Sequence, residues 1–197
     1  LLQGNTLLQT FDLNSCTTIG SYINIQSNPV LTSIGAAGFG NLVSYGGGTI
    51  HLTNSLVPAL DFSQITTPFT SHVIITGNAA LVSVDLSNVP SIGGFVLLQS
   101  NTLLQTLDLS SVTSIASYLT LSGNTVLHTA RFSHLETVSG AFSVTSNAAL
   151  TTLDICRLTP PGGSMSVSGY GSPFTCGALH PGLHAACSAV GCQTLTP

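Results

Sequence analysis

The sequence carries very little charge. Asp, Glu, Lys and Arg make up 4% of its 197 residues, whereas ordinary globular proteins have roughly 25%. Lys is absent, and the two basic residues are Arg131 and Arg157. A net charge of −4 with so few cations argues against binding to nucleic acid or to an anionic membrane surface. We therefore expect no nucleic-acid partner, and solubility must come from Ser, Thr, Asn and Gln.

Long apolar runs, leader sequences and glycosylation sequons are also missing. No run approaches the roughly 18 residues that a membrane-spanning helix needs, so we expect no membrane span. No secretory leader or lipidation signal is visible, which favours a mature piece that starts in the middle of a repeat. Because no Asn-X-Ser/Thr sequon occurs, any glycan is expected to be O-linked to Ser or Thr.

Sequence motifs of common enzyme classes are absent as well. The chain has no G-x-S-x-G, no H-E-x-x-H and no phosphate-binding glycine loop. We therefore expect a protein that is not an enzyme, with no catalytic residues and no cofactor.

What the sequence does have is a repeat. An asparagine closes each short apolar phrase, and most of these asparagines are spaced by 23 residues, with a longer interval of 26 between the second and the third. The series is Asn5, Asn28, Asn54, Asn78, Asn101, Asn124 and Asn147. Such a period predicts a solenoid in which each coil buries its apolar face only by stacking on its neighbours. We expect the asparagines to turn inward at a corner and form a structural ladder of side-chain amides.

Within each repeat the apolar residues alternate with polar ones in three short bursts. Alternation with period 2 is typical of strands rather than helices. The sequence therefore predicts an all-β fold, a parallel β-solenoid of about seven 23-residue coils. We place the solenoid repeats at residues 1–158 and a cysteine-containing C-terminal cap at residues 159–197.

The pattern L-x-L-x-x-N-x-x-L-x-x-L-D-L-S-x-V-x-S-I, seen between Leu98 and Leu119 and repeated in neighbouring coils, resembles the receptor L-domain, a relative of the leucine-rich repeats. The resemblance covers roughly residues 2–155. L-domains occur in growth-factor receptor ectodomains and in fungal cell-wall glycoproteins. The resemblance implies a non-catalytic, extracellular module that binds through outward side chains or loops.

Four of the five cysteines lie in or just before the tail. Two disulfides in a secreted protein would suit a short cap with little core, so we expect Cys156, Cys176, Cys187 and Cys192 to pair, with three pairings open. Cys16 is expected to be a buried free thiol. An alternative for the tail is a zinc site made by Cys176, His180, His184 and Cys187, but we expect no metal.

Acidic residues recur seven positions after most of the asparagines. The column reads Asp12, Gly35, Asp61, Asp85, Asp108, Arg131 and Asp154. We expect each carboxylate to cap the turn that follows it, and Arg131 to pair with its neighbours in the column. The alternatives are a calcium site or an acid/base pair for glycan cleavage.

Three functional classes remain. The first is an extracellular structural or interaction module of a cell-surface or matrix protein that contacts other copies of itself, another extracellular protein or a glycan. Self-assembly, including head-to-tail stacking, accompanies it, because Ile74, Phe95, Leu97 and Tyr118 form an outward apolar contact patch and the first coil is uncapped. The alternatives are an ice-binding protein with a flat Ser/Thr face and a receptor-type domain that binds a glycan or a protein ligand.

Overall fold

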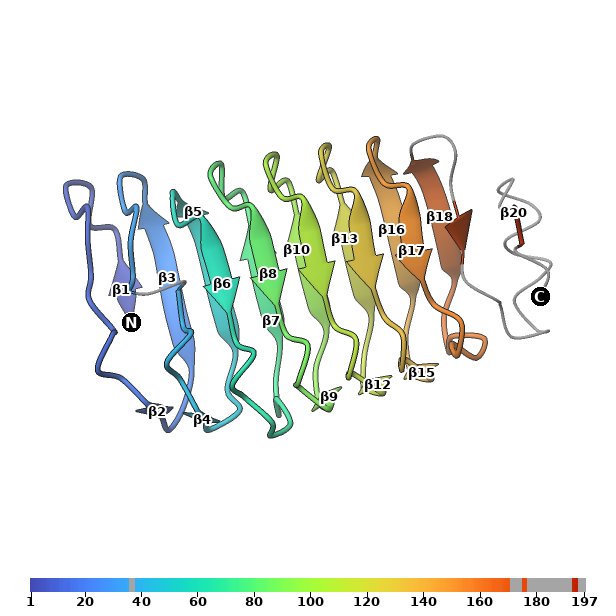
Figure 1. Cartoon of the computed structure of the whole chain (residues 1–197), viewed down its shortest axis with the longest axis horizontal. Coiled ribbons are helices and arrows are strands. Elements are labelled where there is room, and N and C mark those ends of the chain that lie inside the picture. Colours follow the sequence, from blue (N-terminus) through green and yellow to red (C-terminus); the bar gives the residue numbers. More distant parts are fainter. Residues whose placement is uncertain (36–37, 171–174, 177–192, 195–197) are drawn as a thin grey trace.

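The computed structural model describes residues 1–35, 38–170, 175–176 and 193–194, and these residues form a parallel β-solenoid of about seven coils. The chain advances along the long axis of the molecule, one rung per coil (Figure 1). The described part of the chain contains no helix. The prediction of an all-β parallel solenoid is confirmed.

The strands form two long sheets and two short ones. The eight-stranded sheet contains β1 (Leu2–Gln3), β3 (Ile23–Asn28), β5 (Ile50–Ser55), β7 (Val73–Thr76), β10 (Val96–Gln99), β13 (Leu119–Ser122), β16 (Phe142–Asn147) and β18 (Met165–Tyr170). The seven-stranded sheet contains β6 (Ala59–Asp61), β8 (Ser83–Asp85), β11 (Thr106–Asp108), β14 (Thr129–Arg131), β17 (Thr152–Asp154), β19 (Thr175–Cys176) and β20 (Gln193–Thr194). The short sheets contain β9 (Ser91–Ile92), β12 (Ser114–Ile115) and β15 (Thr137–Val138), and β2 (Thr18–Ile19) and β4 (Ser44–Tyr45).

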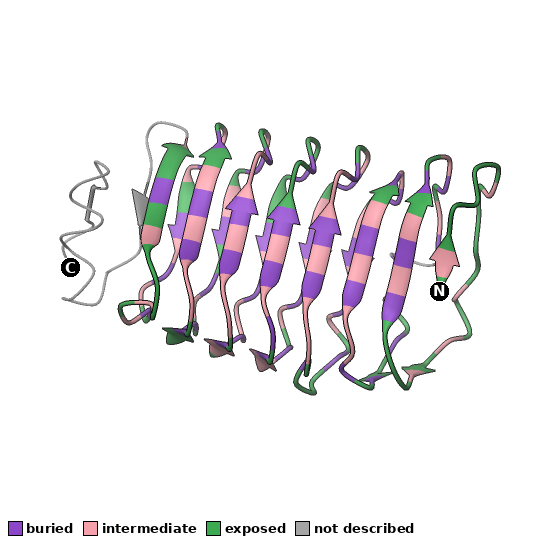
Figure 2. Cartoon of the chain, turned by 180° about the vertical axis from the view of Figure 1, so that it is seen from behind, coloured by how far each residue is buried: buried purple, intermediate pink, exposed green. Residues whose placement is uncertain are grey.

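The register of the strands places like residues of successive coils above one another. Leu98 of β10 pairs with Ile75 on one side and with Leu121 on the other, and all three side chains are at most 1% exposed. The residues between them point outward, so buried and half-buried bands alternate along the strands of the eight-stranded sheet (Figure 2). This period-2 burial is the reason that short Leu, Ile and Val bursts form strands here.

A left-handed residue turns the chain at every corner after the eight-stranded sheet. The residues with φ of +51° to +67° at this corner are Gly4, Ser27, Asn54, Gly77, Ser100, Gly123, Ser146 and Gly169. Gly adopts such angles without strain, and Asn is among the few other residues that do so readily. The residue that follows turns inward at six of these corners.

The prediction for Asn54 is wrong, because Asn54 occupies the left-handed position and its side chain is exposed. The inward residue of that coil is Ser55, which is 1% exposed and pairs with Asn28 in the register of β3 and β5. If Asn54 turned inward, the preceding residue, Thr53, would have to adopt the left-handed conformation. A β-branched residue is strained in that conformation. The corner of this coil is therefore shifted by one residue.

The longer second coil and the coil that follows it share an aromatic cluster in the core. Phe62 stacks on Phe39 with ring centroids 4.8 Å apart and meets Phe69 edge to face at 5.9 Å. Tyr45 packs against Phe69 at 5.0 Å, and its hydroxyl donates a hydrogen bond of 2.7 Å to the Gly48 carbonyl. Burial raises the pKa of Tyr45 to about 12. These large rings fill the space that the longer coil encloses.

Parallel pairing continues past residue 158, which is the end that the sequence predicts for the solenoid repeats. β18 extends the eight-stranded sheet by pairing with β16, and β19 extends the seven-stranded sheet by pairing with β17.

Among the described residues, no helix is long and apolar enough to cross a membrane.

Candidate functional site

The asparagine ladder lies inside the corner and is buried. Asn78, Asn101 and Asn124 are fully buried, and the backbone N–H and side-chain amide of each donate to the Oδ1 of the next asparagine at 3.0–3.3 Å. The Nδ2 of Asn101 also donates to the carbonyl of Ile75 at 2.9 Å. Each amide thus joins three successive coils.

The ends of the ladder differ from its middle. Asn5 donates to Oδ1 of Asn28 at 3.0 Å but is itself exposed. Asn147 accepts from Asn124 and donates to the carbonyl of Leu121 at 2.9 Å. In place of Asn54, the hydroxyl and backbone N–H of Ser55 donate to Oδ1 of Asn78 at 2.9 and 3.1 Å. Among the described residues, no buried side-chain polar atom lacks a hydrogen-bond partner, so the buried amides of the ladder bond one another and the backbone of adjacent coils.

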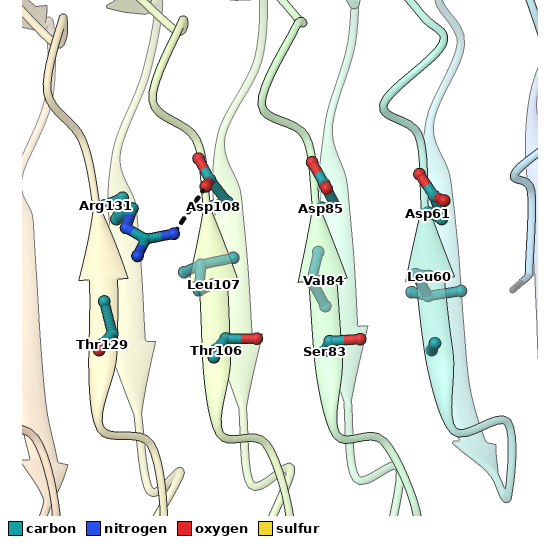
Figure 3. A pocket seen from close by; sticks show the side chains of 11 residues that line it. Leu60, Asp61, Ser83, Val84, Asp85, Thr106, Leu107, Asp108, Thr129 and Arg131 are labelled. Atoms are coloured by element: carbon teal, nitrogen blue, oxygen red, sulfur yellow. Dashed lines mark hydrogen bonds and ion pairs between the residues drawn. The ribbon is translucent and has the colours of Figure 1, made fainter.

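The acidic column lines a shallow groove on the outer face of the seven-stranded sheet. The groove has a volume of about 270 Å³ and runs between a row of carboxylates and a row of hydroxyls. Figure 3 shows Asp61, Asp85 and Asp108 in one row, which Arg131 continues. Ser83, Thr106 and Thr129 form the second row.

Each carboxylate in this groove is engaged by the turn that follows it. The Oδ1 atoms of Asp61, Asp85 and Asp108 accept the backbone N–H two residues later at 2.8–2.9 Å. Arg131 donates to Oδ2 of Asp108 at 3.3 Å. In the structure Asp154 accepts instead from the hydroxyl of Ser133, at 2.6 Å. The column therefore stabilises turns, and the described residues contain no cluster of three or more His, Cys, Asp or Glu suited to a metal ion.

The predicted contact patch lies on the opposite long sheet. Leu97 pairs with Ile74 in the register of β10 and β7, and both side chains are half-buried. Phe95 and Tyr118 lie in the column just before these strands, and their rings stack with centroids 4.6 Å apart and an angle of 6° between the planes. The structure thus brings all four residues of the patch together on three neighbouring coils.

Sequence reasoning missed the third ring of this stack. His72 stacks on Phe95 with centroids 4.0 Å apart, and its Nδ1 accepts the backbone N–H of Phe95 at 3.1 Å. The stack requires Gly94, since a Cβ there would lie 2.1 Å from Nδ1 of His72. The spacing of His72, Phe95 and Tyr118 by 23 residues was the available signal.

The outer face that carries the patch has no Asp, Glu, Lys or Arg in its two outward columns. The two outward columns of β3 to β18 contain Asn, Gln, Ser, Thr, His, Ile and Leu only. His51 lies in one of these columns, and burial lowers its pKa. The Nδ1 of His51 lies 2.8 Å from Nε2 of Gln26 on the neighbouring coil.

The first coil leaves apolar side chains in contact with solvent. Leu1 is 77% exposed and Leu7 is 88% exposed, and Phe11 and Tyr22 are also exposed. A cavity of about 170 Å³ opens beside them and reaches the core residue Ile23. This end of the solenoid is the most apolar exposed region of the described chain.

The predicted disulfide-bonded cap is not supported. Cys156 is a free, half-buried thiol whose Sγ lies 3.7 Å from the carbonyl of Ser133, and no disulfide occurs among the described residues. Burial, followed by the nearby carboxylate of Asp154, raises its pKa. Cys16 is also free, but it is half-buried rather than buried. The side chains of Cys176, Cys187 and Cys192 lie outside the described residues, as do His180 and His184.

Fold and surface together define a class: a parallel β-solenoid with a structural asparagine ladder and one uncharged, partly aromatic face. Comparison of the chain with protein-family models, with curated proteins and with solved structures finds no match.

Proposed function

We propose that this chain is a non-catalytic extracellular interaction module, related to the receptor L-domain, that binds another protein or another copy of itself. The observation that carries the proposal is the patch of Ile74, Phe95, Leu97 and Tyr118. Four apolar side chains on three adjacent coils share a face that has no Asp, Glu, Lys or Arg. A clustered apolar surface of this kind marks a contact site in soluble proteins. The extracellular placement rests on the resemblance of the repeat to L-domains.

The experiment compares the association of matched variants by light scattering and small-angle X-ray scattering. Leu97→Asp places a charge in the centre of the patch, and Ser143→Asp places the same charge in the same outward column two coils away. Both side chains point away from the core, so both variants are expected to keep the fold. Association that is lost in Leu97→Asp and kept in Ser143→Asp supports the patch, whereas equal behaviour of the two variants contradicts it.

Head-to-tail assembly is a second part of the proposal and uses the exposed apolar first coil. A contact between unlike surfaces that does not close into a ring generates a filament. Leu7→Asp tests this surface, because Leu7 is 88% exposed and lies on the first coil, away from the patch. Electron microscopy of the native protein should show filaments or fixed oligomers, and Leu7→Asp should shorten or abolish them. Isolated monomers of the native protein at every concentration would contradict assembly.

Ice binding is an alternative that one observation favours. In the last three rungs of the eight-stranded sheet, the outward pairs are Thr120/Ser122, Ser143/Thr145 and Ser166/Ser168, held in register. Strands are about 4.8 Å apart, so the hydroxyls form a regular, flat array. Shaping of ice crystals by the native protein, lost in Thr145→Tyr, would assign the function to this array. Round, unshaped crystals would exclude it.

A further inference from the structure

The stack of rings on the uncharged face ends abruptly at Tyr118. His72, Phe95 and Tyr118 occupy successive rungs of one column, with centroids 4.0 and 4.6 Å apart. The next rungs of the same column hold Ala141 and Ser164, as the hydrogen bonds from Leu119 to Ala141 and from Phe142 to Ser164 show. Ala141 has a single side-chain carbon, so the ring of Tyr118 has no ring stacked on its far side.

The other end of the stack has a different surrounding. The rung before His72 holds Thr49, whose Oγ1 lies 3.0 Å from the hydroxyl of Ser71. That hydrogen bond fixes a branched side chain beside the imidazole. The open position in the column is therefore the one above Ala141, and its height is one rung, about 4.8 Å. The rings of the column stack with centroids 4.0 and 4.6 Å apart, so one rung leaves room for one further ring.

The groups around the open position are hydroxyls. Thr120 and Ser143 lie in the adjacent outward column, on the rungs of Tyr118 and Ala141, and Ser166 follows on the next rung. All three side chains point outward. Two residues along a strand separate the columns by about 7 Å, which is within reach of the substituents of a six-membered ring that lies on Tyr118.

We infer that Tyr118, Ala141 and Ser143 form a subsite for one neutral pyranose ring of a glycan. The apolar C–H face of the sugar would stack on the free face of Tyr118, because the electron-rich face of an aromatic ring attracts the slightly positive hydrogens of C–H groups. The sugar hydroxyls would bond the hydroxyls of Ser143 and Thr120. The absence of Asp, Glu, Lys and Arg from this face favours a neutral sugar over an acidic or cationic ligand. The inference rests on the proposed function, since it names a ligand for the same face.

The test uses neutral tetrasaccharides of glucose, mannose, galactose and N-acetylglucosamine as probes, with tetragalacturonate as the acidic counterpart. The readout is the NMR signal of the Ala141 methyl group, which lies on the rung next to the Tyr118 ring. Titration extends to about 50 mM, because a single exposed subsite is expected to have a dissociation constant of about 1 mM. At least one neutral probe is expected to shift this signal saturably, and tetragalacturonate should bind more weakly.

Three variants separate stacking from other effects. Tyr118→Ala should weaken binding at least about tenfold, and Tyr118→Phe, which keeps the ring, should bind nearly as well as the native protein. Ala141→Leu should fill the open position with an aliphatic side chain that offers no ring face and should abolish binding, which is then followed by calorimetry. Tyr22→Ala is the matched control, because Tyr22 precedes strand β3 as Tyr118 precedes β13 and is 52% exposed. It should leave binding unchanged.

Several results would overturn the inference. These are the lack of any shift with all four neutral probes, binding that survives in Ala141→Leu, and stronger binding of tetragalacturonate. Light scattering of Ala141→Leu in parallel keeps the two proposals apart, since Ala141 lies outside the patch of Ile74, Phe95, Leu97 and Tyr118. If the native protein associates but binds none of the sugars, the subsite is refuted and the protein-contact function stands. If it binds a sugar but shows no association that Leu97→Asp removes, the protein-contact function is refuted and the subsite stands.

Discussion

Replacement of Asn101 by Ala should destabilise the solenoid strongly. The side chain of Asn101 is fully buried, and its Oδ1 accepts the backbone N–H and the Nδ2 of Asn78, both at 3.1 Å. Its Nδ2 donates to the Ile75 carbonyl at 2.9 Å and to Oδ1 of Asn124 at 3.3 Å. An orphaned buried N–H costs about 1–3 kcal/mol, and the three other lost hydrogen bonds cost about 1 kcal/mol each. The free energy of unfolding should therefore fall by about 4–6 kcal/mol.

The matched control is Asn54→Gly. Asn54 has the same side chain, but it is exposed and its φ is +51°, an angle that Gly adopts without strain. Its replacement should change the free energy of unfolding by less than about 0.5 kcal/mol. Urea unfolding followed by circular dichroism measures both, and with an m value of about 2–3 kcal/mol/M the midpoint of Asn101→Ala should fall by about 1–3 M. A stabilising role of the ladder is refuted if Asn101→Ala unfolds at the native midpoint, or if Asn54→Gly loses as much stability.

Three further predictions concern the core, the pH dependence and the thiols. Leu107→Ala empties a site that is 2% exposed and should lower the free energy of unfolding by about 2–5 kcal/mol in urea titrations; a loss below 1 kcal/mol would mean that the coil collapses around the cavity. Burial lowers the pKa of His51, so its contribution to stability is fully present above its ordinary pKa of 6.5 and is lost as the pH falls below that value. Urea midpoints from pH 8 to pH 5 should decline less in His51→Gln than in the native protein, and parallel curves would contradict this. The raised pKa of Cys156 should slow its alkylation at pH 7.5, and Asp154→Asn should accelerate it, as measured by mass spectrometry; equal rates in both proteins would remove the role of the carboxylate.

Most of the fold follows from the sequence, because the repeat constrains every coil in the same way. The period of 23 residues places Leu98 between Ile75 and Leu121, and this register is what the strands show. The corner at Asn54 was missed because the asparagines were aligned by residue type alone. The residue before each other ladder asparagine is Gly or Ser, whereas Thr precedes Asn54. A left-handed position explains that difference, and it would have identified Ser55 as the inward residue.

The surface was less predictable than the core. Spacing alone brings Phe95 next to Tyr118, but the participation of His72 depends on the small residue at Gly94 and on a hydrogen bond to its Nδ1. The pattern of apolar and polar residues predicts neither the need for a glycine at position 94 nor the hydrogen bond to His72. Cys156 was misjudged for a related reason, since the even count of cysteines in the tail favoured disulfides. The thiol of Cys156 instead hydrogen-bonds to the carbonyl of Ser133 on the preceding coil.

Departures from the repeat have different consequences inside and outside the solenoid. In the core, larger side chains fill the extra space of a longer coil, as the stack of Phe39 on Phe62 does beside the long second coil. On the outer face of the seven-stranded sheet, Asp61, Asp85 and Asp108 recur because each of their carboxylates accepts a backbone N–H of the turn that follows. On the eight-stranded sheet the outward residues do not cap turns in this way. Their identity can therefore be set by the ligand that the face binds. The step from Tyr118 to Ala141 is such a departure, and the fold gives no structural reason for an aromatic column to end there. Binding should therefore be sought at that step before the regular parts of the surface.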